Sequence, residues 1–94
     1  MAKAIITSDL RDLHYGEVTV DAIAAVPITH AITVSECRHI GYWHGPTGGL
    51  TSLAVEGPDQ ESRIGAPCES LLTHVVNIHI CTPEAVARFA AVKP

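Results

Sequence analysis

The clearest pattern in the chain is an alternation of apolar and polar residues between Ile28 and Ile40. A period of two is typical of a strand that buries one face. Glu36 and Arg38 interrupt the apolar side of this strand. We therefore expect that side to be buried mainly over its first half, unless a bulge shifts the pattern.

A stretch rich in glycine, with one proline, follows over residues 41–49. This composition is typical of turns. Residues 50–56 then return as a predicted strand, with Leu53 and Val55 on its inward side. Together the segments predict a long hairpin over residues 28–56.

Three other segments have patterns of the strand type. Residues 3–8 form a short first strand, and from residue 17 to residue 22 polar and apolar positions alternate. Residues 71–81 also alternate, and the pattern places Val76, Ile78 and Ile80 on the inward face. Residues 21–26 fit a short helix equally well, and the sequence does not separate the two readings.

The strongest helix signal lies near the end of the chain. Thr82 is a good N-cap, Pro83 suits the first helical position, and Glu84 places an acid in the first turn. Val86 and Phe89 begin an apolar stripe along the following residues. We predict a helix over residues 83–92.

These elements predict a single α+β domain over residues 1–94, built on a mainly antiparallel sheet. The length fits one domain. If residues 21–26 and 60–73 are both helical, the order of elements approaches the split βαβ pattern of ferredoxin-like folds.

Composition then changes the picture of the surface. Hydrophobic residues make up 47% of the chain and charged residues only 17%, against roughly 25% charged in an average soluble domain. So few charges leave apolar side chains on the surface, which favours association with itself or with a larger protein assembly. The net charge of −4 and the scattered arginines argue against nucleic acid and against a polybasic membrane contact.

The cysteine count and the beginning of the chain bear on location. Three cysteines cannot form a complete disulfide framework, and residues 1–10 lack the long apolar segment of a secretory signal. No apolar run approaches the roughly 20 residues of a transmembrane helix. We expect a cytoplasmic protein, or one that belongs to a particle assembled in the cytoplasm.

Two mirror-image spacings are the main candidates for chemistry. Cys37 and His39 lie two residues apart in one predicted strand, and His79 and Cys81 do so in another. If the strands are neighbours, two thiolates and two imidazoles form a tetrahedral zinc site. The spacing departs from the usual zinc motifs, so the competing interpretation is four polar residues at a subunit contact.

Other candidates for catalysis are weaker. Cys68 with His74 resembles a nucleophile with its base only in composition, because nothing in the spacing brings the two together. His30 lies among aliphatic residues, where a hydrogen-bonded core histidine is the commoner case. The turn at 45–49 is followed by a predicted strand, whereas a phosphate-binding loop needs a helix there and a Gly-Lys-Ser/Thr motif.

The ring-bearing residues beside the turn suggest a contact surface. Tryptophan and tyrosine are enriched in protein interfaces. We expect the interface to include residues of the turn and of the C-terminal helix, together with the edges of the sheet: Tyr42, Trp43, His44 and Phe89.

The sequence thus predicts a non-catalytic structural or accessory subunit, of the kind found in shells, coats or enzyme complexes. The first alternative is a zinc-binding module that uses Cys37, His39, His79 and Cys81. The second is a small-molecule enzyme with a Cys/His site between subunits.

Overall fold

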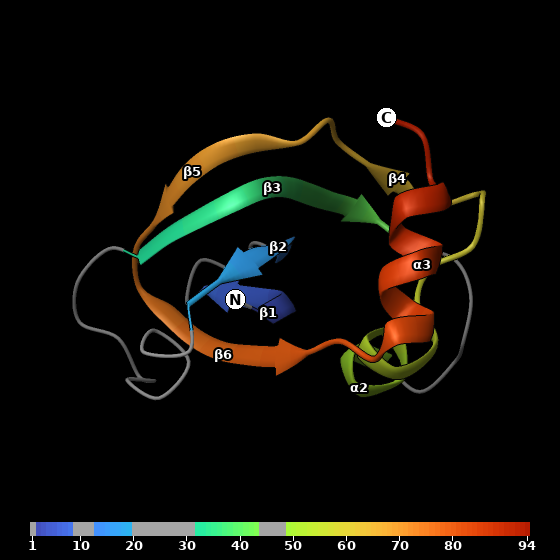
Figure 1. Cartoon of the computed structure of the whole chain (residues 1–94), viewed down its shortest axis with the longest axis horizontal. Helices are drawn as coiled ribbons and strands as arrows, with labels where there is room; N and C mark the ends of the chain where they lie inside the picture. The colour runs from blue at the N-terminus through green and yellow to red at the C-terminus, as the bar shows by residue number, and fades with distance from the viewer. Residues whose placement is uncertain (1, 9–12, 20–31, 44–48) are drawn as a thin grey trace.

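The computed structural model describes residues 2–8, 13–19, 32–43 and 49–94, and the statements below concern those residues. They form a small α+β domain with an antiparallel sheet of six strands and two helices, as the sequence predicts in outline (Figure 1). The elements are β1 (Ala2–Ser8), β2 (Leu13–Val18), β3 (Ile32–Tyr42), α2 (Gly49–Glu56), β4 (Arg63–Ile64), β5 (Cys68–Leu72), β6 (Val75–Ile80) and α3 (Pro83–Ala91).

The sheet runs in the order β4-β3-β2-β1-β6, and β5 pairs with β3 beside β4. The first strand is therefore an interior strand, with β2 on one side and β6 on the other. All of these pairings are antiparallel.

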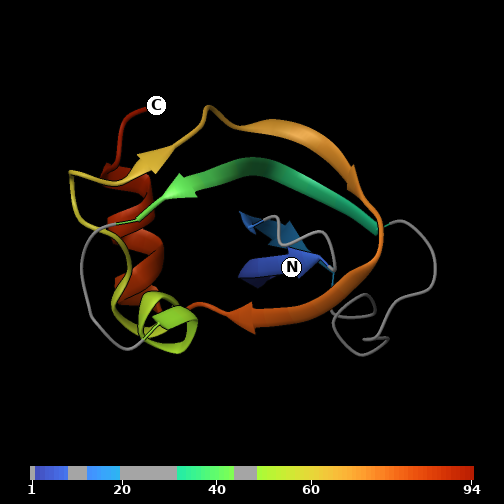
Figure 2. The same cartoon turned by 180° about the vertical axis from the view of Figure 1, so that it is seen from behind.

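The sheet is strongly curled. Its two edge strands, β5 and β6, follow one another around a corner at Thr73 and His74, where His74 adopts a φ of 55°. In Figures 1 and 2 the strands consequently form a ring, and α3 stands on the side opposite this corner. One continuous stretch of chain thus supplies both edges of the sheet.

Side chains on the two faces of the sheet form two separate apolar clusters. The first is made by strand residues, because alternate residues of a strand point to the same face. Its buried members are Ala4, Ile6, Val18, Ile32, Val34, Cys37 and Val75.

The second cluster joins the other face of the sheet to the two helices. Phe89 of α3 lies at its centre and stacks on Tyr15, with ring centroids 3.9 Å apart. The remaining buried members are Ile5, Ile40, Leu53, Ala54, Ile64 and Val92.

A bulge in β3 explains why its apolar pattern breaks. Glu36 has a φ of 51°, and the pairing register shifts on both sides of β3 at this point. Val34 and Cys37 consequently both belong to the first cluster, whereas Ile40 belongs to the second. The extra residue thus moves the second half of the strand onto the opposite face.

The predicted hairpin over residues 28–56 is not formed. Residues 50–56 lie within helix α2, and β3 pairs instead with β2, β4 and β5. Leu53 and Ala54 bury one side of the helix, and Gly57 ends it with a φ of 81° and an N–H that donates to Leu53 O at 2.8 Å. A glycine in this conformation is a common stop signal for a helix.

The structure decides only one of the two segments whose secondary structure the sequence did not determine. Residues 60–73 contain β4 and β5 and, in the structure as described, no helix. Residues 21–26 and His30 lie outside the described residues. The ferredoxin-like arrangement stays unconfirmed, since it needs a parallel pair and the described strands pair antiparallel.

The C-terminal helix follows its sequence signals closely. It spans Pro83–Ala91, and the Thr82 side chain accepts a hydrogen bond from the N–H of Ala85 at 3.2 Å. Thr82 also donates its hydroxyl to the carbonyl of Val55 at the end of α2. The cap therefore joins the two helices directly after β6.

Candidate functional site

The structure does not bring the four expected zinc ligands together. Cys37 and His39 lie on β3, whereas His79 lies on β6 and Cys81 just after it. Strands β2 and β1 lie between them, which separates the backbones by about 14 Å along the sheet at about 4.8 Å per strand. Zinc ligands instead surround one ion at about 2.0–2.3 Å.

The two pairs also project from opposite faces of the sheet. Cys37 belongs to the first cluster, but His79 lies opposite Ile5, which belongs to the second. Residues directly opposite in an antiparallel pair point to the same face. Across the described segments, no group of three or more His, Cys, Asp and Glu residues is arranged to hold a metal ion.

Each member of the set has a different environment. Cys37 is buried, while His39 is exposed and packs edge-to-face against His14 with ring centroids 5.3 Å apart. Cys81 is half-buried against the second cluster, and this burial raises the pKa of its thiol to about 11. These are separate sites with separate chemistry.

The residues expected at an interface differ in their exposure to solvent. Tyr42 is 50% exposed and remains available for a contact. Trp43 is half-buried and packs against the second cluster, and His44 lies outside the described residues. Phe89 has no exposed surface, so its assignment to an interface is corrected: it is a core residue of α3.

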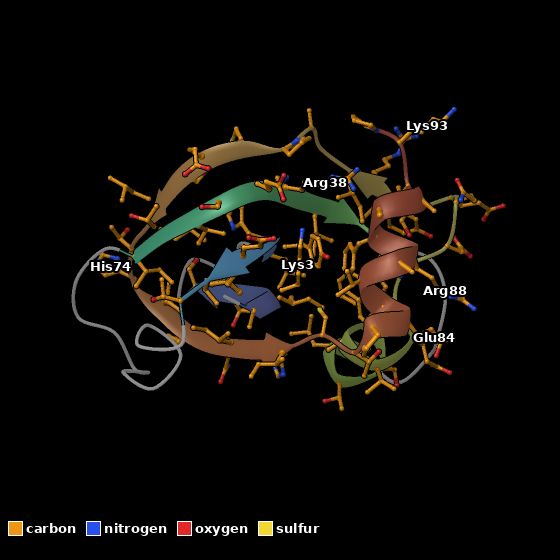
Figure 3. The ribbon with its side chains drawn as sticks, in the orientation of Figure 1. Lys3, Arg38, His74, Glu84, Arg88 and Lys93 are labelled. Atoms are coloured by element: carbon orange, nitrogen blue, oxygen red, sulfur yellow. The ribbon has the colours of Figure 1, made fainter. Side chains whose placement is uncertain are left out.

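Sequence reasoning missed the role of Arg38. This side chain is 8% exposed, and its guanidinium donates hydrogen bonds to backbone carbonyls of two distant segments. In Figure 3 it lies where β3 approaches α3. The acceptors are Gly65 O at 2.7 Å, Ile64 O at 3.4 Å, Phe89 O at 2.7 Å and Val92 O at 2.6 Å.

A hollow of about 160 Å³ lies beside this arginine and is lined in part by Lys3, Tyr15 and Glu36. Figure 3 shows Lys3 within the ring of strands. The Lys3 ammonium lies 3.2 Å from a carboxylate oxygen of Glu17 and 3.2 Å from one of Glu36. Burial lowers the pKa of Lys3, but hydrogen bonds to Glu17 and Glu36, together with charge interactions with Tyr15 and Glu17, raise that pKa overall.

We expect stability to fall as the pH rises from about 9 to about 12. Burial raises the pKa of Tyr15 from 10.0 to about 12 and that of Cys81 from 9.0 to about 11. The unfolded chain releases these protons at lower pH than the folded chain, so the folded state binds more protons in this range. The stabilisation is complete below pH 9 and is lost as the pH passes the folded values.

Urea unfolding at increasing pH measures this effect. Tyr15→Phe should flatten the fall in stability above pH 10, and Cys81→Ser should flatten the part that begins near pH 9. If the stability of both variants falls with pH as steeply as that of the parent chain, the assignment to these two groups is wrong.

A larger and more polar hollow, of about 540 Å³, opens on the other side of β3 and β4. Arg63 and Lys93 supply its positive charge and Glu61 its negative charge, while Gly41 and Gly65 leave room beside His39. Its lining is mixed in charge and its wall is open to solvent. We assign it no reaction.

The comparisons place the chain in a family. The model of a domain of unknown function, DUF6948, matches residues 1–89 of the 94. The chain belongs to this family. No curated protein and no solved structure matches it. No helix in the described part of this DUF6948 chain is long and apolar enough to cross a membrane.

The most distinctive surface of this DUF6948 chain is the outer edge of β6. Among the described strands only β1 pairs with β6, so its other edge carries no described partner strand. Val76 is 42% exposed and Ile80 is 57% exposed. The sequence pattern placed both inward. Ile80 does lie opposite the buried Ala4, but both side chains remain exposed because β6 is an edge strand with a register shift beside Val75.

One hydrogen bond shows which residues of β6 direct their backbone N–H and C=O groups toward β1 and which direct them outward. The N–H of Cys81 donates to Lys3 O at 3.0 Å. Bonded and non-bonded pairs alternate along an antiparallel ladder, so the backbone groups of Ile78 and Ile80 point away from β1. The edge therefore presents apolar side chains and outward backbone donors and acceptors at the same residues.

Proposed function

We propose that this chain is a small non-catalytic structural or accessory subunit that associates with a second copy of itself through the outer edge of β6. The observation that carries the proposal is that, within the described part of the chain, this edge has no partner strand and no feature that blocks pairing. Natural edge strands usually carry a lysine, a proline or an inward-pointing charge that blocks pairing. Residues 75–80, Val-Val-Asn-Ile-His-Ile, contain none of these.

A second copy fits this edge because the strand is complementary to itself. Antiparallel pairing about a two-fold axis at Ile78 sets Val76 opposite Ile80 of the second copy and Asn77 opposite its His79. Apolar residues thus face apolar residues, and polar face polar. The register also uses the outward backbone groups of Ile78, which pair with those of Ile78 in the second copy, and leaves those of Ile80 facing Val76 across the axis.

The size of this contact sets its expected strength. Six strand residues span about 20 Å, and one strand pairing buries less than the roughly 1,200–2,000 Å² of a standard interface. Val55 of α2 is 47% exposed, and its carbonyl accepts the hydroxyl of Thr82 just after β6. It therefore adds exposed apolar surface near the end of this strand. We expect a dimer that dissociates on dilution.

The test is the oligomeric state of a double variant, Val76→Lys with Ile80→Lys. In the proposed register each new lysine lies opposite a lysine of the second copy, so like charges meet twice across the axis. We expect the dimer Kd to rise about 100-fold, or roughly 2.7 kcal/mol. Sedimentation velocity over a concentration series measures it, and circular dichroism checks that the variant is folded.

Leu71→Lys is the matched control. Leu71 is 69% exposed on β5, so the same substitution adds a charge to an apolar surface residue away from β6. This variant should dimerise like the parent chain. A monomeric parent chain at high concentration, or a dimer lost in Leu71→Lys and kept in the double variant, would overturn the proposal.

A further inference from the structure

Two of the three cysteines lie opposite one another on neighbouring strands. Cys37 of β3 and Cys68 of β5 are register partners, although 31 positions separate them in the sequence. Directly opposite residues in an antiparallel pair have Cα atoms about 4.5–5.5 Å apart. A disulfide needs Cα atoms about 4.4–6.8 Å apart, which includes the usual separation of directly opposite residues.

The side chains of this pair share one hydroxyl neighbour. The Sγ of Cys68 lies 3.4 Å from the Oγ of Ser70, two residues along β5 on the same face. Burial raises the pKa of the Cys37 thiol, and a hydrogen bond to the same Ser70 lowers it in part. Both sulfur atoms therefore lie close to one hydroxyl, on the face that carries the first cluster.

The two thiols differ in access to solvent. Cys68 is exposed, whereas Cys37 is 2% exposed. Thiol–disulfide exchange begins with attack by an accessible thiolate and ends when a second thiol displaces the mixed disulfide. The chain thus holds an outer thiol that meets a reagent and an inner thiol placed behind it.

We propose that Cys37 and Cys68 form an oxidation site for small disulfides of the glutathione type. The thiolate of Cys68 attacks one sulfur of the small disulfide, forms a mixed disulfide and releases one small thiol. The thiol of Cys37 then loses its proton and attacks the Cys68 sulfur, forming the Cys37–Cys68 bond and releasing the second small thiol. The two cysteines are oxidised together, and the small disulfide is reduced to two thiols.

The experiment treats the full chain with oxidised glutathione and follows the products by intact mass under non-reducing conditions. The parent chain should lose the mass of two hydrogen atoms with no lasting adduct, and peptide mapping should recover Cys37 joined to Cys68. Cys37→Ser should stop at one glutathione per chain, carried on Cys68. Cys81→Ser is the matched control and should react like the parent chain.

Each other outcome overturns the proposal. A lasting glutathione adduct on the parent chain would mean that Cys37 does not reach Cys68. A covalent dimer joined through two Cys68 residues would make the reaction intermolecular. Equal rates in the parent chain and in Cys68→Ser would remove Cys68 from the first step. Because these readouts concern bonds within one chain, their failure leaves the test of the β6 edge unaffected.

Discussion

Replacing Arg38 with methionine is expected to lower the free energy of unfolding by about 3 kcal/mol. The guanidinium donates to four carbonyls, of Ile64, Gly65, Phe89 and Val92. Methionine fills similar space but donates nothing, and each buried acceptor left without a donor costs roughly 1–3 kcal/mol. Relaxation of the end of α3 toward water lets some of these carbonyls bond to water instead, so we expect a loss below the sum for four acceptors.

Urea unfolding followed by the fluorescence of Trp43, the single tryptophan, measures this change. The matched control is Arg88→Met on the outer side of α3 (Figure 3), where the side chain is half exposed and lies 3.6 Å from Glu84. Exposed pairs of this kind contribute about 0.3–0.5 kcal/mol. If the two methionine variants are equally stable, the bonds of Arg38 do not hold α3 to β3 and β4.

Phe89→Ala is expected to have the largest effect, a loss of about 4 kcal/mol in the free energy of unfolding. Truncating a fully buried phenylalanine to alanine costs roughly 3–5 kcal/mol, because the removed atoms leave a cavity. Here the substitution also removes the stacking on Tyr15, which lies 3.9 Å away with the rings 9° from parallel.

This experiment separates the core role of Phe89 from its assignment to an interface. The measurement is made in the Val76→Lys, Ile80→Lys background, so that association does not contribute. Tyr42→Ala, at a 50% exposed aromatic residue, is the control and should cost less than about 1 kcal/mol. A Phe89→Ala chain that is stable in this background, and that dimerises poorly when it carries Val76 and Ile80, would restore the interface role.

The elements that local signals define were predictable from the sequence. The helix after Thr82 is confirmed because its cap, its proline and its acid all act within one turn. The helix over Gly49–Glu56 was missed although its signals were present: Leu50, Leu53 and Ala54 recur at helical spacing, and Gly57 follows as a stop. A short apolar run fits both patterns, and the expected hairpin decided the choice wrongly.

The candidate sites depended on which strands are neighbours, and spacing along the chain does not contain that information. Cys37 lies opposite Cys68 of the neighbouring strand β5. The zinc hypothesis instead grouped Cys37 with His79 and Cys81, which two intervening strands separate from β3. Arg38 was treated as a break in an apolar face, because the bulge at Glu36 that turns it into the interior is a tertiary feature. Long-range register therefore decided both outcomes.

The interior position of β1, between β2 and β6, has a consequence for synthesis. This strand pairs with β2 as soon as residues 13–18 are available, but its other neighbour, β6, ends at residue 80. A ribosome adds about 5–20 residues per second, so the nascent chain carries one open edge of β1 for several seconds while residues 19–74 are made. The strand that finally covers that edge is β6, whose own outer edge has no partner among the described strands.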